Sequence, residues 1–429
     1  MSKIKWGVGG IVAVATLAVG GNLYADKSLQ TYYQQEAKQP SKNLSLNYQN
    51  FQMGALQGSA DWTAELILDP CKPKEVIKLT GRDQIQRSWN GYQIQSDVKV
   101  VQADSALKSL VNQPLKLKTH VNWLGTMKST LTTPVIVRNE AKIQTRLDPV
   151  TLEYRARPVN DQLQMQDLKL DIPNLTVMDA ETHFQMTGLK IETNQGLNGN
   201  YLEAGKTTVQ MDLLKMADRG LNNPISAELK NYRIEAESDL TDRVLNTKMA
   251  VQVGEMKMTF SPVMQNVKFN FNVQDVNRAK LQALFDIIEK SENSCLAQEK
   301  LLQDLEPALL AVINEGFKFD SSDNQIKIGT GEAKASLAGR FMPSHQKTLK
   351  GMVAMVPSLV EYKADVQFDK NMVASIMNSI PGKGGQSMSD QDIETMLSSM
   401  QQSGQLKRDG DVMKMVMEYK YGEKKFLTE

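Results

Sequence analysis

Apolar and polar residues alternate along most of this 429-residue chain, and no other feature limits its possible folds as strongly. In a β-strand successive side chains point to opposite faces, so strict alternation predicts strands with one apolar and one polar face. Because short turn-forming segments separate the alternating runs, antiparallel pairing is favoured. The clearest runs are "LNYQNFQ" (46–52), "LKLKTHVNW" (115–123), "PVIVRNEAKIQTRL" (134–147), "LQMQDLKLDI" (163–172), "THFQMTGLKIET" (182–193) and "KTTVQMDL" (206–213).

Two later runs separate the two faces well, and a third, near the C-terminus, follows the same alternation. The polar residues between their apolar residues are expected to face solvent. The apolar sets are Val267, Phe269, Phe271 and Val273; Val360, Tyr362, Ala364, Val366 and Phe368; and Met413, Met415, Met417 and Tyr419. The last set either fills a core, because methionine packs irregular gaps, or forms an apolar binding face for a guest. Copper(I) binding through these thioethers is a further reading, but no histidine or cysteine accompanies them.

Helical patterns are confined to the second half of the chain. Apolar spacing predicts helices within 276–315, interrupted near Pro307 and ending at Gly316. "SDQDIETMLSSM" predicts another, with Ser389 as N-cap and Asp392 three residues later. We therefore expect an α+β fold dominated by strands, in which an extended, curved antiparallel sheet carries covering helices. By contrast, "FDSSDNQIKI" (319–328) is interpreted as a hairpin turn.

The first 27 residues resemble a membrane segment. Lys3 and Lys5 precede an uncharged run from Trp6 to Tyr24 and Ala25 that is long enough to span a bilayer as a helix. One interpretation is a transmembrane anchor, and the others are a cleaved signal peptide and a buried helix. The first two place the remaining chain outside the inner membrane. The anchor residues are Trp6, Ile11, Val12, Leu17 and Tyr24.

These patterns divide the chain into four regions. The expected order is the membrane anchor or signal peptide (1–27), a stalk (28–43), an antiparallel β-rich region (44–275), and helices with C-terminal strands that complete the sheet (276–429). Cys71 and Cys295 are the only cysteines, and in an oxidising compartment they either form a disulfide or remain two separate buried thiols.

Composition and motifs exclude some functions. Fifty basic residues against 49 acidic ones provide no general attraction for nucleic acid. The three histidines stand apart, and no metal-binding or cofactor-binding motif is present, so we expect no cofactor. One weak motif fits an exported hydrolase, because Ser105 and Lys108 form an S-x-x-K sequence and "SDN" follows at 322–324, although the third K-T-G element is missing.

Several segments together resemble the YdgA-like family of bacterial envelope proteins, a family of unknown function. They are the N-terminal membrane segment with its polar helix, "LILDPCKP" (66–73), "FNFNVQDVNRAKLQALFDII" (269–288) and "IETMLSSMQQSGQLKRDGDVMKMVMEYKYGEKKF" (393–426). The resemblance implies an inner-membrane protein with a large periplasmic part that is able to form homo-oligomers. It implies no catalytic residues.

Two functions follow as hypotheses. The first is a non-enzymatic envelope protein, tethered to the inner-membrane bilayer, that binds an amphiphile such as a lipid, or another envelope protein. The alternative is a periplasmic serine hydrolase or acyl transferase that uses Ser105 and Lys108.

Overall fold

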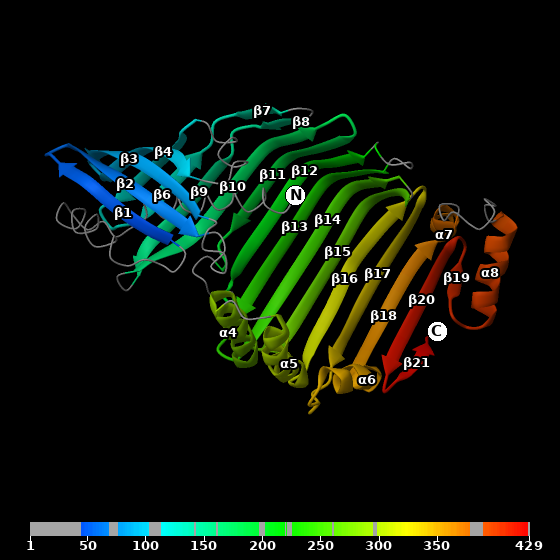
Figure 1. Ribbon diagram of the computed structural model, residues 1–429. Helices are drawn as coiled ribbons and strands as arrows, with labels where there is room; N and C mark the ends of the chain where they lie inside the picture. Colours follow the sequence, from blue (N-terminus) through cyan, green and yellow to red (C-terminus); the bar gives the residue numbers. More distant parts are fainter. Residues whose placement is uncertain are drawn as a thin grey trace. The chain divides into compact units, whose positions relative to one another are not determined.

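Strands dominate the computed structural model, which is shown in Figure 1. It describes residues 44–67, 76–102, 113–140, 143–159, 162–196, 202–218, 220, 225–259, 261–294, 298–377 and 389–427. Contacts within the chain define two compact units. Unit 1 comprises mainly residues 44–180 and 187–196, and unit 2 mainly 202–291 and 298–427. The strand β11 (Thr182–Thr193) contributes residues to both units.

Unit 1 is an antiparallel meander. Neighbouring strands follow the order β1, β2, β3, β4, β5, β6, β9, β10. The strands are β1 (Leu44–Met53), β2 (Gln57–Ile67), β3 (Val76–Ser88), β4 (Gly91–Gln102), β5 (Leu115–Asn122), β6 (Met127–Thr132), β7 (Ile136–Glu140), β8 (Ile143–Leu147), β9 (Thr151–Val159) and β10 (Gln162–Met178).

Two prolines interrupt the hairpin formed by β6 to β9. Thr132 is paired with Thr151, and beyond the break Ile136 is paired with Leu147, so Pro134 lies opposite Pro149. Proline donates no backbone hydrogen bond, so the ladder breaks at this level on both strands. On the side of the break away from the hairpin turn β6 pairs with β9, and on the side nearer the turn β7 pairs with β8. The strands expected in "PVIVRNEAKIQTRL" are thus confirmed as β7 and β8.

The apolar face of unit 1 is almost completely shielded from solvent. Alternate residues from β2 to β9 form one cluster in which most side chains are no more than 3% exposed, for example Trp62, Leu79 and Tyr154. Partly buried residues of the two outer strands, β1 and β10, pack against the same cluster. All residues of this cluster, and all those packed against it, lie in or between the strands β1 to β10.

Unit 2 is a second antiparallel meander. Its strands follow the order β12, β13, β14, β15, β16, β17, β18, β20, and the short β19 and β21 both pair with β20. The strands are β12 (Gly205–Asp218), β13 (Ile225–Leu240), β14 (Val244–Met258), β15 (Ser261–Asn277), β16 (Phe317–Ile328), β17 (Gly331–Phe341), β18 (Val360–Asp369), β19 (Lys407–Asp409), β20 (Val412–Lys420) and β21 (Glu423–Phe426).

Five helices are described. They are α4 (Arg278–Ser294), α5 (Gln298–Asn314), α6 (Leu349–Leu359), α7 (Lys370–Met377) and α8 (Asp390–Gln402). The two helices expected within 276–315 are confirmed as α4 and α5. The interruption expected near Pro307 was wrong, because α5 continues through this residue and a proline removes only one backbone donor from the helix. The capping box of α8 is confirmed as well, because Ser389 and Asp392 bind each other's backbone N–H groups. Within unit 2, α4, α5 and α6 lie at one end of the strands (Figure 1).

One expectation about a turn was wrong. The segment 319–328 is no hairpin, because Phe317–Ile328 forms the single strand β16. Its register with β17 shifts between Ser321 and Asn324, and Asp323 takes the left-handed conformation with φ 55°. Turn-forming residues are thus accommodated inside a strand as a bulge.

Candidate functional site

The strands of unit 2 place their apolar residues in continuous cross-strand rows. Residues directly opposite each other in adjacent strands lie on the same side of a sheet. One row runs through Val209, Ile234, Val251 and Phe269, from β12 to β15. A second row runs through Ala335, Val366 and Met415, from β17 to β20. We call the side of the sheet that bears these and the parallel rows the apolar face. Its further members include Met211, Tyr232, Val253, Val267, Phe271, Leu337, Tyr362, Ala364, Met417 and Tyr419.

Burial distinguishes this face from the core of unit 1. Leu79 and Val98 of unit 1 are 0% exposed, whereas Phe269 is 43% exposed. Most other residues of the apolar face are half-buried, and even Val253 keeps 8% of its surface exposed. Both units have the same alternation of apolar and polar residues. The difference in exposure therefore arises from how far other parts of the chain cover the apolar side chains. The described chain leaves the middle of the apolar face accessible.

Aromatic residues make parts of the apolar face flat. The rings of Phe269 and Phe271 are stacked with centroids 6.3 Å apart, and those of Tyr362 and Tyr419 with centroids 5.2 Å apart. Such planar surfaces, interleaved with flexible methionine side chains, suit contact with a guest of variable shape.

The opposite side of the same strands is charged. Along β13, Arg233 and Glu235 alternate with Tyr232 and Ile234, and Glu235 forms ion pairs with Arg233 and, at 3.2 Å, with Lys206. Hydrogen bonds from Arg233 and then from Lys206 lower the pKa of Glu235. The Glu235 carboxylate is therefore ionised at neutral pH, and this side of the sheet is the solvated one. Elsewhere on β13, hydrogen bonds to Glu228 and then to Glu255 raise the pKa of Lys230.

The helices α7 and α8 cover one end of the apolar face. Ile393 and Leu397 of α8 pack with Met413, which is 0% exposed, and Phe368 of β18 joins this cluster. Met415, Met417 and Tyr419 are half-buried. The four predicted binding residues are therefore in one strand, but Met413 lies beneath a helix while the other three remain accessible from the apolar face.

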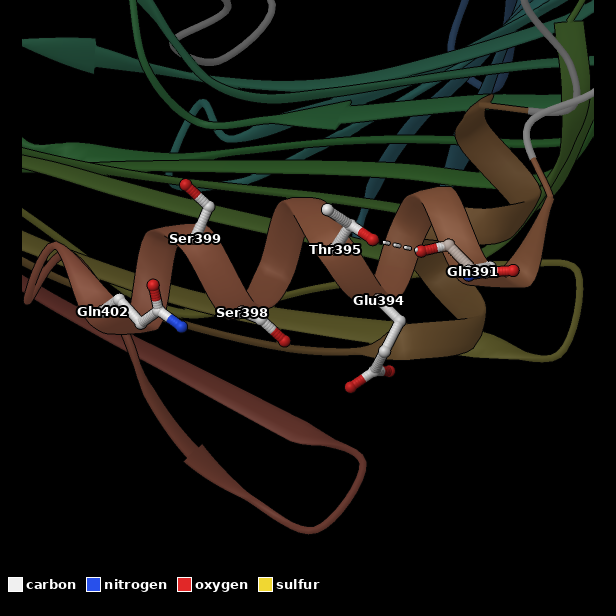
Figure 2. Close-up of a pocket in the computed structure, with 6 residues that line it drawn as sticks. All are labelled: Gln391, Glu394, Thr395, Ser398, Ser399 and Gln402. Atoms are coloured by element: carbon white, nitrogen blue, oxygen red, sulfur yellow. Dashed lines mark hydrogen bonds between the residues drawn. The ribbon is translucent and has the colours of Figure 1, made fainter.

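The outer surface of α8 carries a shallow polar hollow, shown in Figure 2. Thr395 donates a hydrogen bond to the carbonyl of Gln391, and Glu394 forms ion pairs with Arg408 and Lys370. The two ion pairs connect α8 to α7 and to β19. The hollow is lined by Gln391, Glu394, Thr395, Ser398, Ser399 and Gln402.

Several predicted residues lie outside the described parts of the chain. Their roles as membrane anchor, disulfide and nucleophile with its partner remain predictions. They are Trp6, Ile11, Val12, Leu17, Tyr24, Cys71, Cys295, Ser105 and Lys108. Among the described residues no helix is both long and apolar enough to cross a membrane, and no group of three or more metal-ligating side chains occurs.

The "SDN" segment has a structural role. Asn324 accepts a hydrogen bond from the backbone N–H of Asn270 at 2.8 Å and donates one to Ser321 at 2.8 Å. These bonds stabilise the bulge of β16 against β15. Sequence reasoning had treated this segment as a possible partner for Ser105.

Sequence reasoning missed a group of apolar residues at hairpin turns of unit 1. We call Leu56, Trp89, Trp123 and Leu124 the tryptophan tip, and Trp89 is 90% exposed. The turns are joined by hydrogen bonds, from the Trp123 indole to the Trp89 carbonyl at 2.8 Å and from the Arg87 amide to the Leu56 carbonyl at 2.8 Å. The available clue was a tryptophan in a turn, where polar residues are usual, as in "SWNG" and "NWLG".

Fold and surfaces define a β-dominated protein in which one sheet side is apolar and accessible and the other is charged. The chain belongs to a bacterial family of unknown function, DUF945, whose model matches residues 1–426. Comparisons with curated proteins and with solved structures gave no significant match.

Proposed function

We propose that the chain is a non-enzymatic protein, anchored in the bacterial inner membrane with its bulk in the periplasm, that binds an amphiphile such as a lipid on the apolar face. The accessible, half-buried rows of this face carry the proposal. The uncharged run from Trp6 to Ala25 supports the anchor, and the resemblance to YdgA-like envelope proteins supports the compartment.

The size of the rows favours a long-chain guest. Each buried methylene group contributes about 0.8 kcal/mol, whereas association costs about 4 kcal/mol or more. A guest with roughly ten methylene groups therefore gains about 8 kcal/mol and exceeds the lower part of that cost, while a short one does not. The row from Val209 to Phe269 crosses four strands, which offers such a chain contact along its length.

Val251→Asp is expected to reduce bound lipid at least about tenfold, because a carboxylate placed in the central row would have to lose water beneath an acyl chain. Native mass spectrometry of the full-length protein, released from mild detergent, would measure the lipid adducts. Gln252→Asp is the matched control, since it adds the same charge at the next residue, on the solvated side of β14.

Binding through the N-terminal segment would affect both variants equally, so the comparison reports on the apolar face. Wild-type protein without lipid adducts, or equal adducts in both variants, would contradict the proposal.

A second candidate function, attachment to another envelope protein, is favoured by the tryptophan tip. Tryptophan, tyrosine and arginine are enriched where protein interfaces concentrate their binding energy. Here Tyr92 packs edge-on against Trp123 with ring centroids 5.3 Å apart, and the Arg87 guanidinium lies 5.9 Å from the Tyr92 centroid. Hydrogen bonds between the turns hold the group in place before any partner arrives.

A photo-crosslinking amino acid at position 89 of the full-length protein in cells is expected to yield a discrete protein adduct, which Trp123→Ala should weaken about tenfold or more. Position 93 on β4 is exposed and serves as the control. A smear of adducts at both positions would count against a specific partner.

A further inference from the structure

The helix α6 exposes the residues that a surface helix normally buries. Met352 is its only buried residue, while Val353 is 68% exposed and Met355 and Val356 are 40% and 37% exposed. Lys350 is the only charged residue in the helix. A soluble helix usually turns its apolar stripe toward the core and its charged residues outward. In α6 the apolar side chains face solvent instead.

The turn between β20 and β21 lies beside this helix and adds an aromatic residue. A Cβ atom placed on Gly422 would lie 3.9 Å from the Pro357 carbonyl oxygen of α6. The neighbouring Tyr421 is 68% exposed and has a φ of 54°. In Figure 1, α6 and β21 lie at the same end of the sheet. We call Val353, Met355, Val356 and Tyr421 the α6 tip.

Lysines surround the α6 tip. Within the described chain none of them forms an ion pair. The Lys420 ammonium lies 5.2 Å from the centroid of the Tyr421 ring. Glu306, which accepts a hydrogen bond from the Leu349 amide of α6, and Glu418 and Glu423 of β20 and β21 set three carboxylates against the five lysines, so positive charge stays in excess. The lysines are Lys347, Lys350, Lys420, Lys424 and Lys425.

We propose that the α6 tip binds the surface of a membrane that contains anionic lipids. The apolar side chains enter the interface, Tyr421 lies at the level of the headgroups, and the lysines contact lipid phosphates. The tip lies at the ends of the strands that carry Tyr362 and Tyr419, so it would place one end of the apolar face at a lipid source. The inference itself rests on the exposure and charge of the tip and holds with or without a lipid on the sheet.

Charge favours an anionic membrane over two other possible binding partners of the α6 tip. A second copy of the chain that used the same patch would bring lysines against lysines, which is unfavourable. The uncharged segment from Trp6 to Ala25 of this chain offers the lysines no counter-charge. An anionic bilayer supplies both an apolar phase and negative headgroups.

Site-specific crosslinking tests the proposal. Full-length protein with p-benzoylphenylalanine in place of Val353 would be reconstituted in nanodiscs of phosphatidylcholine, alone or mixed with phosphatidylglycerol. Phospholipid adducts of the peptide would be measured by mass spectrometry. We expect more adduct in the anionic nanodiscs, and a loss of at least about fivefold for each of Lys350→Glu and Lys424→Glu, because removing one lysine near an anionic surface already costs about that factor.

The same photoreactive residue at position 252, exposed on the solvated side of β14, is the control for random collisions with lipid. Adduct at position 353 no greater than at 252, or equal in both nanodisc types, overturns the proposal. Adducts that join two copies of the chain overturn it too. Because none of these positions lies in the central rows of the apolar face, failure here is distinguishable from failure of lipid binding there.

Discussion

Asp83→Ala is expected to lower the free energy of unfolding of unit 1 by about 3 kcal/mol. Asp83 is 0% exposed and accepts hydrogen bonds from the Trp62 indole at 2.8 Å and from the Ser96 hydroxyl at 2.5 Å. Alanine would leave both donors inside the core without this acceptor, and each buried donor that lacks a partner costs about 1–3 kcal/mol.

The hydrogen bond from the Trp62 indole to Asp83 depends on a glycine in the same strand as Asp83. Gly81 is paired with Trp62, and a Cβ atom at Gly81 would lie 2.3 Å from the indole ring. The ring therefore lies across Gly81 and reaches Asp83, two residues along the same face of β3.

Denaturant unfolding followed by tryptophan fluorescence would measure the loss. Asp97→Ala is the control, because Asp97 lies on the neighbouring strand β4 and is exposed, so its removal should change the free energy of unfolding by no more than about 0.5 kcal/mol. Equal effects of the two substitutions would show that the buried hydrogen bonds do not stabilise unit 1.

Above about pH 10, unit 1 is expected to lose up to about 1.4 kcal/mol of stability per pH unit through Tyr154. Burial of Tyr154 raises the pKa of its hydroxyl far above the usual value, although a hydrogen bond with Ser129 acts in the opposite direction. Above pH 10 the unfolded chain has lost this proton while the folded one retains it. The folded state then binds more protons, so its stability falls as the pH rises.

Tyr154→Phe should remove this slope. The readout is the difference between the unfolding curves of variant and wild type at several alkaline pH values. Lys230, with its raised pKa, adds a slope of the same sign from unit 2, and this part stays in the variant. Identical alkaline slopes for Tyr154→Phe and wild type would refute this assignment.

Alternation predicted strands well because it reflects local geometry. The runs 182–193 and 360–368 match β11 and β18 almost residue for residue, and the capping box predicted the start of α8. Two short helices were missed. In α6 the sequence "LKGMVAMVPSL" is apolar on nearly all sides and has no helical stripe. The helix α7 is only eight residues long, and its one signal was Asp369, which accepts a hydrogen bond from the Met372 amide.

The candidate site was only partly predictable, for a different reason. Alternation assigns Leu117 of unit 1 and Val251 of unit 2 to an apolar face, but it does not say whether another layer covers that face. The structure buries Leu117 to 1% exposure and leaves Val251 half-buried. The same limit applies within the methionine strand, since only the fold places α8 over Met413 and leaves Met415 accessible.

The two short strands beside β20 have a consequence for solubility. β19 pairs with Val412–Lys414, and β21 pairs with Met417–Lys420, so both halves of an otherwise free border already have hydrogen-bond partners. Lysines and an arginine occupy these two strands, as in "KRD" and "EKKF". An incoming strand from another molecule would find few unpaired amides and a repelling charge there. The sheet can thus expose a wide apolar surface without aggregating with strands of other molecules at this edge.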